Sequence, residues 1–166
     1  IQLDGDVGGS SATGSITLNT DSLNLSGGTL QSDGGLVIQP VTTSASIGLG
    51  GGSGTLNLDD TELGFLQDGF SSIVIGNAGA GTGAVDVDSS TFSDPVTIVG
   101  GSIAVTELNA GSNAVTLTAR TGVISDGGDS GTDVTGSSLV ATSVSGVGAD
   151  GNELSTAVGN LEAAGG

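Results

Sequence analysis

The chain has 166 residues, of which 33 are Gly and 18 are Asp or Glu, and its one basic residue is Arg120. It contains no Cys, His, Met, Trp, Tyr or Lys. Histidine bases, cysteine nucleophiles, Schiff-base lysines and His/Cys metal sites are therefore excluded. The formal net charge of -17 excludes nucleic acid as a partner and argues against docking on anionic lipid. No apolar run reaches the ~18 residues of a membrane-inserted helix.

Short alternating apolar runs recur along the chain. In chain order, these runs begin at Ile16, Leu36, Leu56, Ile73, Val96, Val115, Val134 and, more weakly, Leu154. Successive starts lie about 20 residues apart, and a second short apolar run follows most of them. Alternation places one face of each strand inward and the other outward. Gly, Ser, Asn and Asp fill the intervening turns.

Two short strands per repeat cannot bury their inward face alone, but stacked repeats bury it against one another. The repeat therefore predicts an all-β fold, a parallel β-helix (β-solenoid) of about eight coils with about 20 residues per coil, as a single segment over residues 1–166. An antiparallel sandwich also fits turn signals every 8–12 residues. The recurrence of whole strand pairs favours the solenoid. The predicted inward pairs are Ile16/Leu18, Leu36/Ile38, Leu56/Leu58, Ile73/Ile75, Val96/Ile98 and Val115/Leu117.

Two stretches depart from the repeat. Residues 59–71 place Leu63, Leu66 and Phe70 at helical spacing after an Asp or Thr cap, which predicts an irregular coil with a short helical turn in place of its second strand. Residues 153–166 are expected to form either a cap with a terminal helical turn or a last irregular coil.

The glycine-rich stretch 48–54 lacks the Lys of a phosphate-binding loop, so it is interpreted as a tight corner of the solenoid. The predicted outward column runs through Thr17, Val37, Asn57, Val74, Thr97, Thr116 and Thr135. Four of these seven residues are Thr, a residue type that can form a flat ice-binding face. A surface that matches the ice lattice should repeat the neighbouring column as well, and that column is irregular, so ice binding is not favoured.

Residues 47–63, 70–76 and 115–129 (IGLGGGSGTLNLDDTEL, FSSIVIG and VTLTARTGVISDGGD) resemble the repeat regions of large secreted bacterial surface proteins, the filamentous-haemagglutinin-like adhesins. The resemblance is one of repeat style and covers roughly residues 14–164. It implies a right-handed parallel β-helix on the outside of a Gram-negative-type cell, serving as an adhesive or filamentous rod. The Asn-Pro-Asn-Leu signature of the family's secretion domain is absent, so the resemblance is to the repetitive shaft.

Pectate lyases and polygalacturonases are also parallel β-helices, so polysaccharide degradation is the enzymatic alternative. The stretches 19–21 (Asn-Thr-Asp) and 59–60 (Asp-Asp) look like two polygalacturonase motifs. That family also needs a His motif and an Arg/Lys motif, and this chain has no His and no Lys. Glycoside hydrolysis further needs two carboxylates facing one bond. The chain is therefore predicted not to be an enzyme, and no catalytic residue is assigned.

Carboxylates gather at four places, which are Asp4/Asp6, Asp59/Asp60/Glu62, Asp86/Asp88 and Asp126/Asp129/Asp133. Calcium takes several oxygen ligands from flexible turns. The chain has neither an EF-hand loop nor a Gly-Gly-x-Gly-x-Asp array, so solvated turn carboxylates are expected and no metal or cofactor site is assigned. A calcium-binding or carbohydrate-binding β-helix module is the alternative function.

The function expected from these observations is structural. The chain is predicted to be an extracellular β-solenoid that builds the rod or fibre of a bacterial surface adhesin, either as a piece of a longer chain or as a subunit cut from a precursor. Open β-edges recruit further strands, so the expected partners are neighbouring repeats or a second copy stacked end to end, with surface glycans as the adhesive ligand. Outward carboxylates are expected to keep the fibre soluble in salty surroundings.

Overall fold

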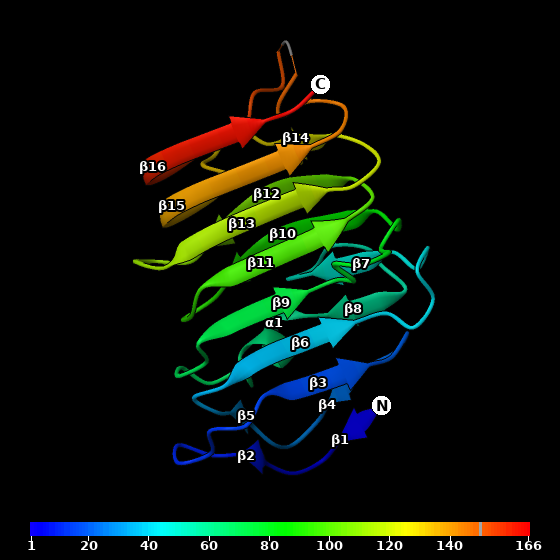
Figure 1. Cartoon of the computed structure of the whole chain (residues 1–166), viewed down its shortest axis with the longest axis vertical. Helices are drawn as coiled ribbons and strands as arrows, with labels where there is room; N and C mark the ends of the chain where they lie inside the picture. Colours follow the sequence, from blue (N-terminus) through cyan, green and yellow to red (C-terminus); the bar gives the residue numbers. More distant parts are fainter. Residues whose placement is uncertain (150) are drawn as a thin grey trace.

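The computed structural model describes residues 1–149 and 151–166, and it is a stack of short parallel strands wound along one axis (Figure 1). In chain order, the first eight strands are β1 (Gln2–Leu3), β2 (Val7–Gly8), β3 (Ile16–Asn19), β4 (Asn24–Leu25), β5 (Leu30–Gln31), β6 (Gly35–Gln39), β7 (Ile47–Leu49) and β8 (Leu56–Leu58). The strands that follow are β9 (Ser72–Ile75), β10 (Val85–Thr91), β11 (Val96–Gly100), β12 (Ile103–Asn109), β13 (Ala114–Ala119), β14 (Ile124–Asp126), β15 (Val134–Ser143) and β16 (Thr156–Ala164). One short helix, α1 (Asp60–Leu63), interrupts them.

The predicted fold class is confirmed, because the chain is an all-β parallel solenoid with almost no helix. It has about 7 turns whose equivalent residues lie about 22 apart, so the predicted eight coils of about 20 residues overcount slightly. Two short N-terminal sheets, β1–β4 and β2–β5, lie below a sheet of 12 strands. In the part of the chain that the structure describes, no helix is long and apolar enough to cross a membrane.

Each coil has three sides, where the sequence predicted two strands. The front sheet is the stack of β3, β6, β9, β11, β13 and the C-terminal halves of β15 and β16, seen in front in Figure 1. The back face holds β8, β7, β14 and the N-terminal halves of β10 and β12. The side face holds the C-terminal halves of β10 and β12 and the N-terminal halves of β15 and β16. The long strands bend across corners, and this hid the third side in the sequence.

One inward column of the front sheet shows how the core is built. Its paired residues are Ile16, Leu36, Ile73, Val96, Val115, Leu139 and Leu161. In-register parallel pairing places each aliphatic side chain directly above the one in the coil below. All twelve predicted inward residues are buried except Ile16, which is partly buried and packs against the core.

The predicted position of the third repeated strand is wrong. β6 pairs directly with β9 through Leu36 and Ile73, whereas β8 pairs with β7 through Leu56 and Ile47 on the back face. Leu56 and Leu58 are nevertheless fully buried, because alternation in β8 still directs them into the core. The back face therefore gains a strand that the front sheet lacks.

The glycine-rich stretch 48–54 is a return loop between two adjacent parallel strands, where the sequence predicted a simple corner. Gly50 and Gly51 have φ of 64° and 118°, in the left-handed region that glycine adopts readily. A Cβ on Gly54 would lie 2.1 Å from the backbone nitrogen of Gly48, so the loop packs directly across β7. Only a chain without side chains at these positions can turn back within so few residues.

Helix α1 lies within residues 59–71, where the sequence places a helical turn. Asp59 is the N-cap: its carboxylate accepts from the Glu62 amide (2.9 Å), and the Glu62 carboxylate accepts from the Asp59 amide (3.1 Å). The other oxygen of the Glu62 carboxylate accepts from the amide of Leu25 in β4 (3.0 Å). A side chain thus satisfies an amide on the edge of β4 that faces away from its partner strand β1.

The helical alternative for the C-terminal stretch is wrong. Thr156–Ala164 is strand β16, which pairs in parallel with β15 along most of its length. The spacing of Leu154, Val158 and Leu161 imitates a helical period, but pairing to an existing strand supplies the backbone hydrogen bonds that an isolated helical turn lacks. The last-coil alternative is the one that the structure supports.

The outward column of the front sheet also differs from prediction. It runs through Thr17, Val37, Val74, Thr97, Thr116, Val140 and Glu162, without Asn57 or Thr135. Strands β3, β6, β9, β11, β13 and β15 contain no Asp or Glu. In a chain of net charge -17, the carboxylates are therefore confined to turns and to the other faces, apart from Glu162.

We expect Leu56→Asp to unfold the coil around β8. Leu56 is fully buried, and an unpaired buried carboxylate costs several kcal/mol. The measurement is thermal unfolding by circular dichroism, with the exposed outward residue Thr17 as the matched control (Thr17→Asp). An unchanged melting temperature for Leu56→Asp would show that β8 does not belong to the core.

Candidate functional site

A groove lies on the side face, one coil above β5. Leu30 of β5 forms a parallel bridge with Leu66, which continues the stack by one level. At the next level, residues 89–91 of β10 pair upward with β12. In the part of the chain that the structure describes, no bridge or hydrogen bond joins residues 65–67 to residues 89–91. The ladder of the side face is interrupted between these two segments.

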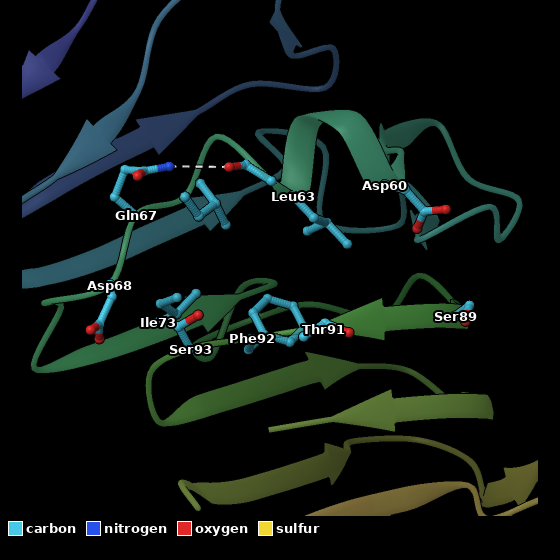
Figure 2. A pocket seen from close by; sticks show the side chains of 11 residues that line it. Asp60, Leu63, Gln67, Asp68, Ile73, Ser89, Thr91, Phe92 and Ser93 are labelled. Atoms are coloured by element: carbon cyan, nitrogen blue, oxygen red, sulfur yellow. Dashed lines mark hydrogen bonds between the residues drawn. The ribbon is translucent and has the colours of Figure 1, made fainter. Parts of the chain in front are cut away.

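The groove occupies this interruption and has a volume of about 580 Å³. Figure 2 shows α1 and Gln67 along one wall and the strand from Ser89 to Ser93 along the other. The buried side chains of Leu63, Ile73 and Phe92 line its interior. An apolar interior with polar groups along the rim is the usual composition of a binding cleft.

Unpaired backbone groups face the groove from both walls. Phe92 donates to the carbonyl of Asn109 (2.9 Å), so Ser90 and Phe92 bond upward and the amide and carbonyl of Thr91 point into the groove. On the opposite wall Leu30 bonds to both neighbours of Leu66, which leaves the Leu66 carbonyl directed into the groove. The groove therefore has the polar backbone edges of a missing strand.

Carboxylates flank the groove. Asp60 and Asp68 line it, and both side chains are exposed. Figure 2 places Asp60 near the Ser89 end and Asp68 near the Ser93 end. Near the second end, buried Asp94 accepts from the amide of Gly69 (3.1 Å). Burial raises the pKa of Asp94, the amides of Gly69 and Phe70 oppose that rise, and the charge of Asp68 adds to it.

The predicted carboxylate cluster at residues 126–133 is brought together by the fold. Oxygens of Asp126, Asp129 and Asp133 lie within 4.8 Å of one another. Asp133 is buried and accepts from the amide of Ser155, one coil above. Burial raises the pKa of Asp133, and the charges of Asp126 and Asp129 raise it further against the opposing Ser155 bond. Three oxygens at this spacing match part of the ligand set that calcium takes.

The Asp4/Asp6 pair does not converge on one point, because each carboxylate bonds to the next coil. Asp4 accepts from the hydroxyl of Ser26, and Asp6 accepts from the amide (2.8 Å) and hydroxyl (2.9 Å) of Thr29. These bonds hold the pKa of both carboxyls below the ordinary value. The pair is therefore a set of links between coils.

The remaining predicted groups also have structural partners. Asp59 and Glu62 form the capping box of α1, and Asp86 accepts from the amide of Ser53 in the glycine-rich loop (2.8 Å). Asp88 accepts from the amide of Ser89 (2.9 Å). Among the residues that look like polygalacturonase motifs, Asp21 accepts from the amide (2.9 Å) and hydroxyl (2.6 Å) of Thr42. That motif therefore serves to join two coils.

The sequence singled out residues 59–71 as irregular but did not reveal the groove. The available signal was the 37-residue interval between the paired residues Leu36 and Ile73, against about 22 elsewhere. Reading Leu56 as a member of the same column divided that interval into two normal repeats and concealed the irregularity.

The fold and its surfaces define the class of this protein as a parallel β-solenoid. Comparison with protein-family models, with curated proteins and with solved structures finds no match.

Two aspartates are expected to affect stability in opposite directions at neutral pH. The pKa of Asp133 is raised in the folded state, so its ionised form destabilises the fold above that pKa, and Asp133→Asn should raise the melting temperature at pH 7 by a few degrees. The hydroxyl and amide of Thr42 lower the pKa of Asp21, so Asp21→Asn should lower the melting temperature at pH 7.

The pH dependence of the same two variants supplies the control. The Asp133→Asn gain should vanish as the pH falls through the raised pKa towards the ordinary Asp value of about 3.9. The Asp21→Asn loss should vanish only below that value, as the pH falls through the lowered pKa. Melting curves from pH 7 to pH 3 measure both, and equal, pH-independent effects would contradict the assignment.

Proposed function

We propose that this chain is a structural segment of an extracellular rod or fibre, the shaft of a bacterial surface adhesin or filament. The observation that carries the proposal is the uninterrupted front sheet, whose inward column runs from Ile16 to Leu161 and is open at the upper end. A stack of this kind is stiff because every coil is bonded to its neighbours along several strands.

The upper end of the stack favours continuation by another coil. Leu161 occupies an inward position of the front sheet, yet it is 58% exposed because no coil covers it. A cavity of about 480 Å³ beside it is lined by apolar residues that include Val147, Leu154 and Ala163. An apolar surface next to an unpaired strand edge suits a further coil, either from the same chain or from a second copy.

Composition and resemblance support the extracellular location and the adhesive role. The acidic surface and the almost complete lack of cations suit salty surroundings that screen like charges. The resemblance to filamentous-haemagglutinin-like repeats adds adhesion, with surface glycans as the ligand. Binding of the purified chain to a glycan array tests the adhesive role. If no glycan binds, the segment is a shaft without an adhesive function of its own.

We expect the chain to self-associate end to end, and Leu161→Glu to abolish this association. The substitution puts a charge on the apolar end, whereas Asn160→Glu adds the same charge to an exposed outward position of the same strand. Sedimentation velocity and electron microscopy at 0.15 M salt measure the association. Glu153 and Glu162 at the upper end and Asp4 and Asp6 at the lower end repel one another, so added salt should strengthen stacking.

Two outcomes would contradict end-to-end association. If the chain stays monomeric at every protein and salt concentration, this segment does not assemble by itself. Equal loss of association in Asn160→Glu and Leu161→Glu would indicate association through the front sheet in place of the ends.

Calcium binding is the second candidate, and it is favoured by the convergence of Asp126, Asp129 and Asp133. A cation bound only to the folded state raises the melting temperature by mass action. We expect calcium to stabilise the chain, a chelator to reverse the effect, and Asp129→Asn to remove it. Asp88→Asn is the matched control, and an equal calcium response in both variants would indicate diffuse screening.

A further inference from the structure

We propose that the groove on the side face binds a short, extended, basic peptide segment, which pairs with the backbone of Thr91 and occupies the missing strand position. This binding does not depend on the proposed shaft function. The groove is bounded by Leu63, Leu66 and Gln67 on one wall and by residues 89–93 on the other.

The backbone of the groove selects an extended segment. Thr91 presents an amide and a carbonyl, and Leu66 presents a carbonyl on the facing wall. These groups face away from their own ladder partners and towards the groove, so a strand placed between them has hydrogen-bonding groups on both of its sides. Addition of a strand to an exposed edge is a general mode of peptide recognition, in which main-chain bonds supply affinity.

The interior of the groove selects the inward side chains of that segment. Leu63, Ile73 and Phe92 line the groove and are 5%, 1% and 4% exposed, so the apolar surface accessible below the rim is small. Alternate residues of a strand point to one face, so every second residue of the occupant should be a small aliphatic one. Residues 89–93 span about 13 Å at ~3.3 Å per residue, the length of a five-residue strand.

The rim selects positive charge on the outward residues. Asp60 and Asp68 lie near opposite ends of the groove, within a chain of net charge -17. The one cation of the chain, Arg120, donates to the carbonyls of Ala78 (2.6 Å) and Gly79 (2.8 Å), so it does not supply the counter-charge at the groove. A basic occupant must therefore come from another chain or from another part of a longer one.

The test uses the whole 166-residue chain and the capped peptide acetyl-Lys-Val-Lys-Val-Lys-amide. Amide chemical shifts of the ¹⁵N-labelled protein are followed at 0.15 M salt while the peptide is added. We expect saturable shifts centred on Thr91, Leu66 and Gln67. Two peptides of unchanged charge test the ladder: N-methylation of both valines blocks one edge of the strand, and N-methylation of the three lysines blocks the other. Each should bind at least tenfold more weakly.

Two protein variants test the role of charge. Asp68→Asn should weaken binding several-fold, whereas Glu162→Gln, which removes the same charge on the distant strand β16, should leave it unchanged. Binding of the N-methylated peptides within twofold of the parent would overturn the proposal. So would equal effects of the two variants, shifts spread over all acidic turns, or no shift at millimolar peptide.

Discussion

The stacking of aliphatic side chains directly above one another is the constraint on which the rest of this structure depends. In-register parallel pairing gives every inward residue one neighbour above and one below, at the spacing of adjacent strands. Val, Ile and Leu fill that spacing. The three phenylalanines lie outside the named strands: Phe65 and Phe70 follow α1 in the irregular coil, and Phe92 follows β10 and lines the groove.

The carboxylates are a second consequence of stacking. Turns at the corners leave amides and hydroxyls without strand partners, and an aspartate in the adjacent coil accepts from several of them, as in the pairs Asp4–Ser26, Asp6–Thr29 and Asp21–Thr42. A carboxylate accepts such bonds more strongly than a neutral oxygen does. The acidic composition is thus in part a set of links between the coils of a chain that has a single basic residue.

The connections between strands limit what could be predicted from the sequence. The alternating runs predicted the solenoid and its buried residues, because burial depends only on the two-residue period within each strand. Pairing depends on the connections, and there the prediction was wrong. Leu56–Leu58 has the same pattern as Leu36–Ile38, but the return loop through Gly50 and Gly54 directs it to the back face. The two-residue period is the same on every face of a coil, so it does not predict which face a strand joins. The close approach of the Gly54 backbone to Gly48 places β8 beside β7 on the back face.

The groove follows from the same irregularity. The back face gained strand β8 between two coils whose front strands, β6 and β9, remain in direct contact. Among the described residues, no bridge joins Leu66 to Thr91 on the side face, so the ladder is interrupted at this level. Helix α1 fills part of the opening, but a four-residue helix offers no ladder edge to β10. The backbone groups of Leu66 and Thr91 remain unpaired because the back face has one more strand at this level than the side face.

The position of the groove separates the proposed peptide binding from the proposed assembly of a shaft. Coils above or below the segment contact its two ends, whereas an occupant of the groove enters from the side at the level of α1. A segment bound there adds ladder bonds between two coils that otherwise lack them on this face. In the proposed rod, such a segment would therefore strengthen a junction that lacks side-face bonds, without competing for either end.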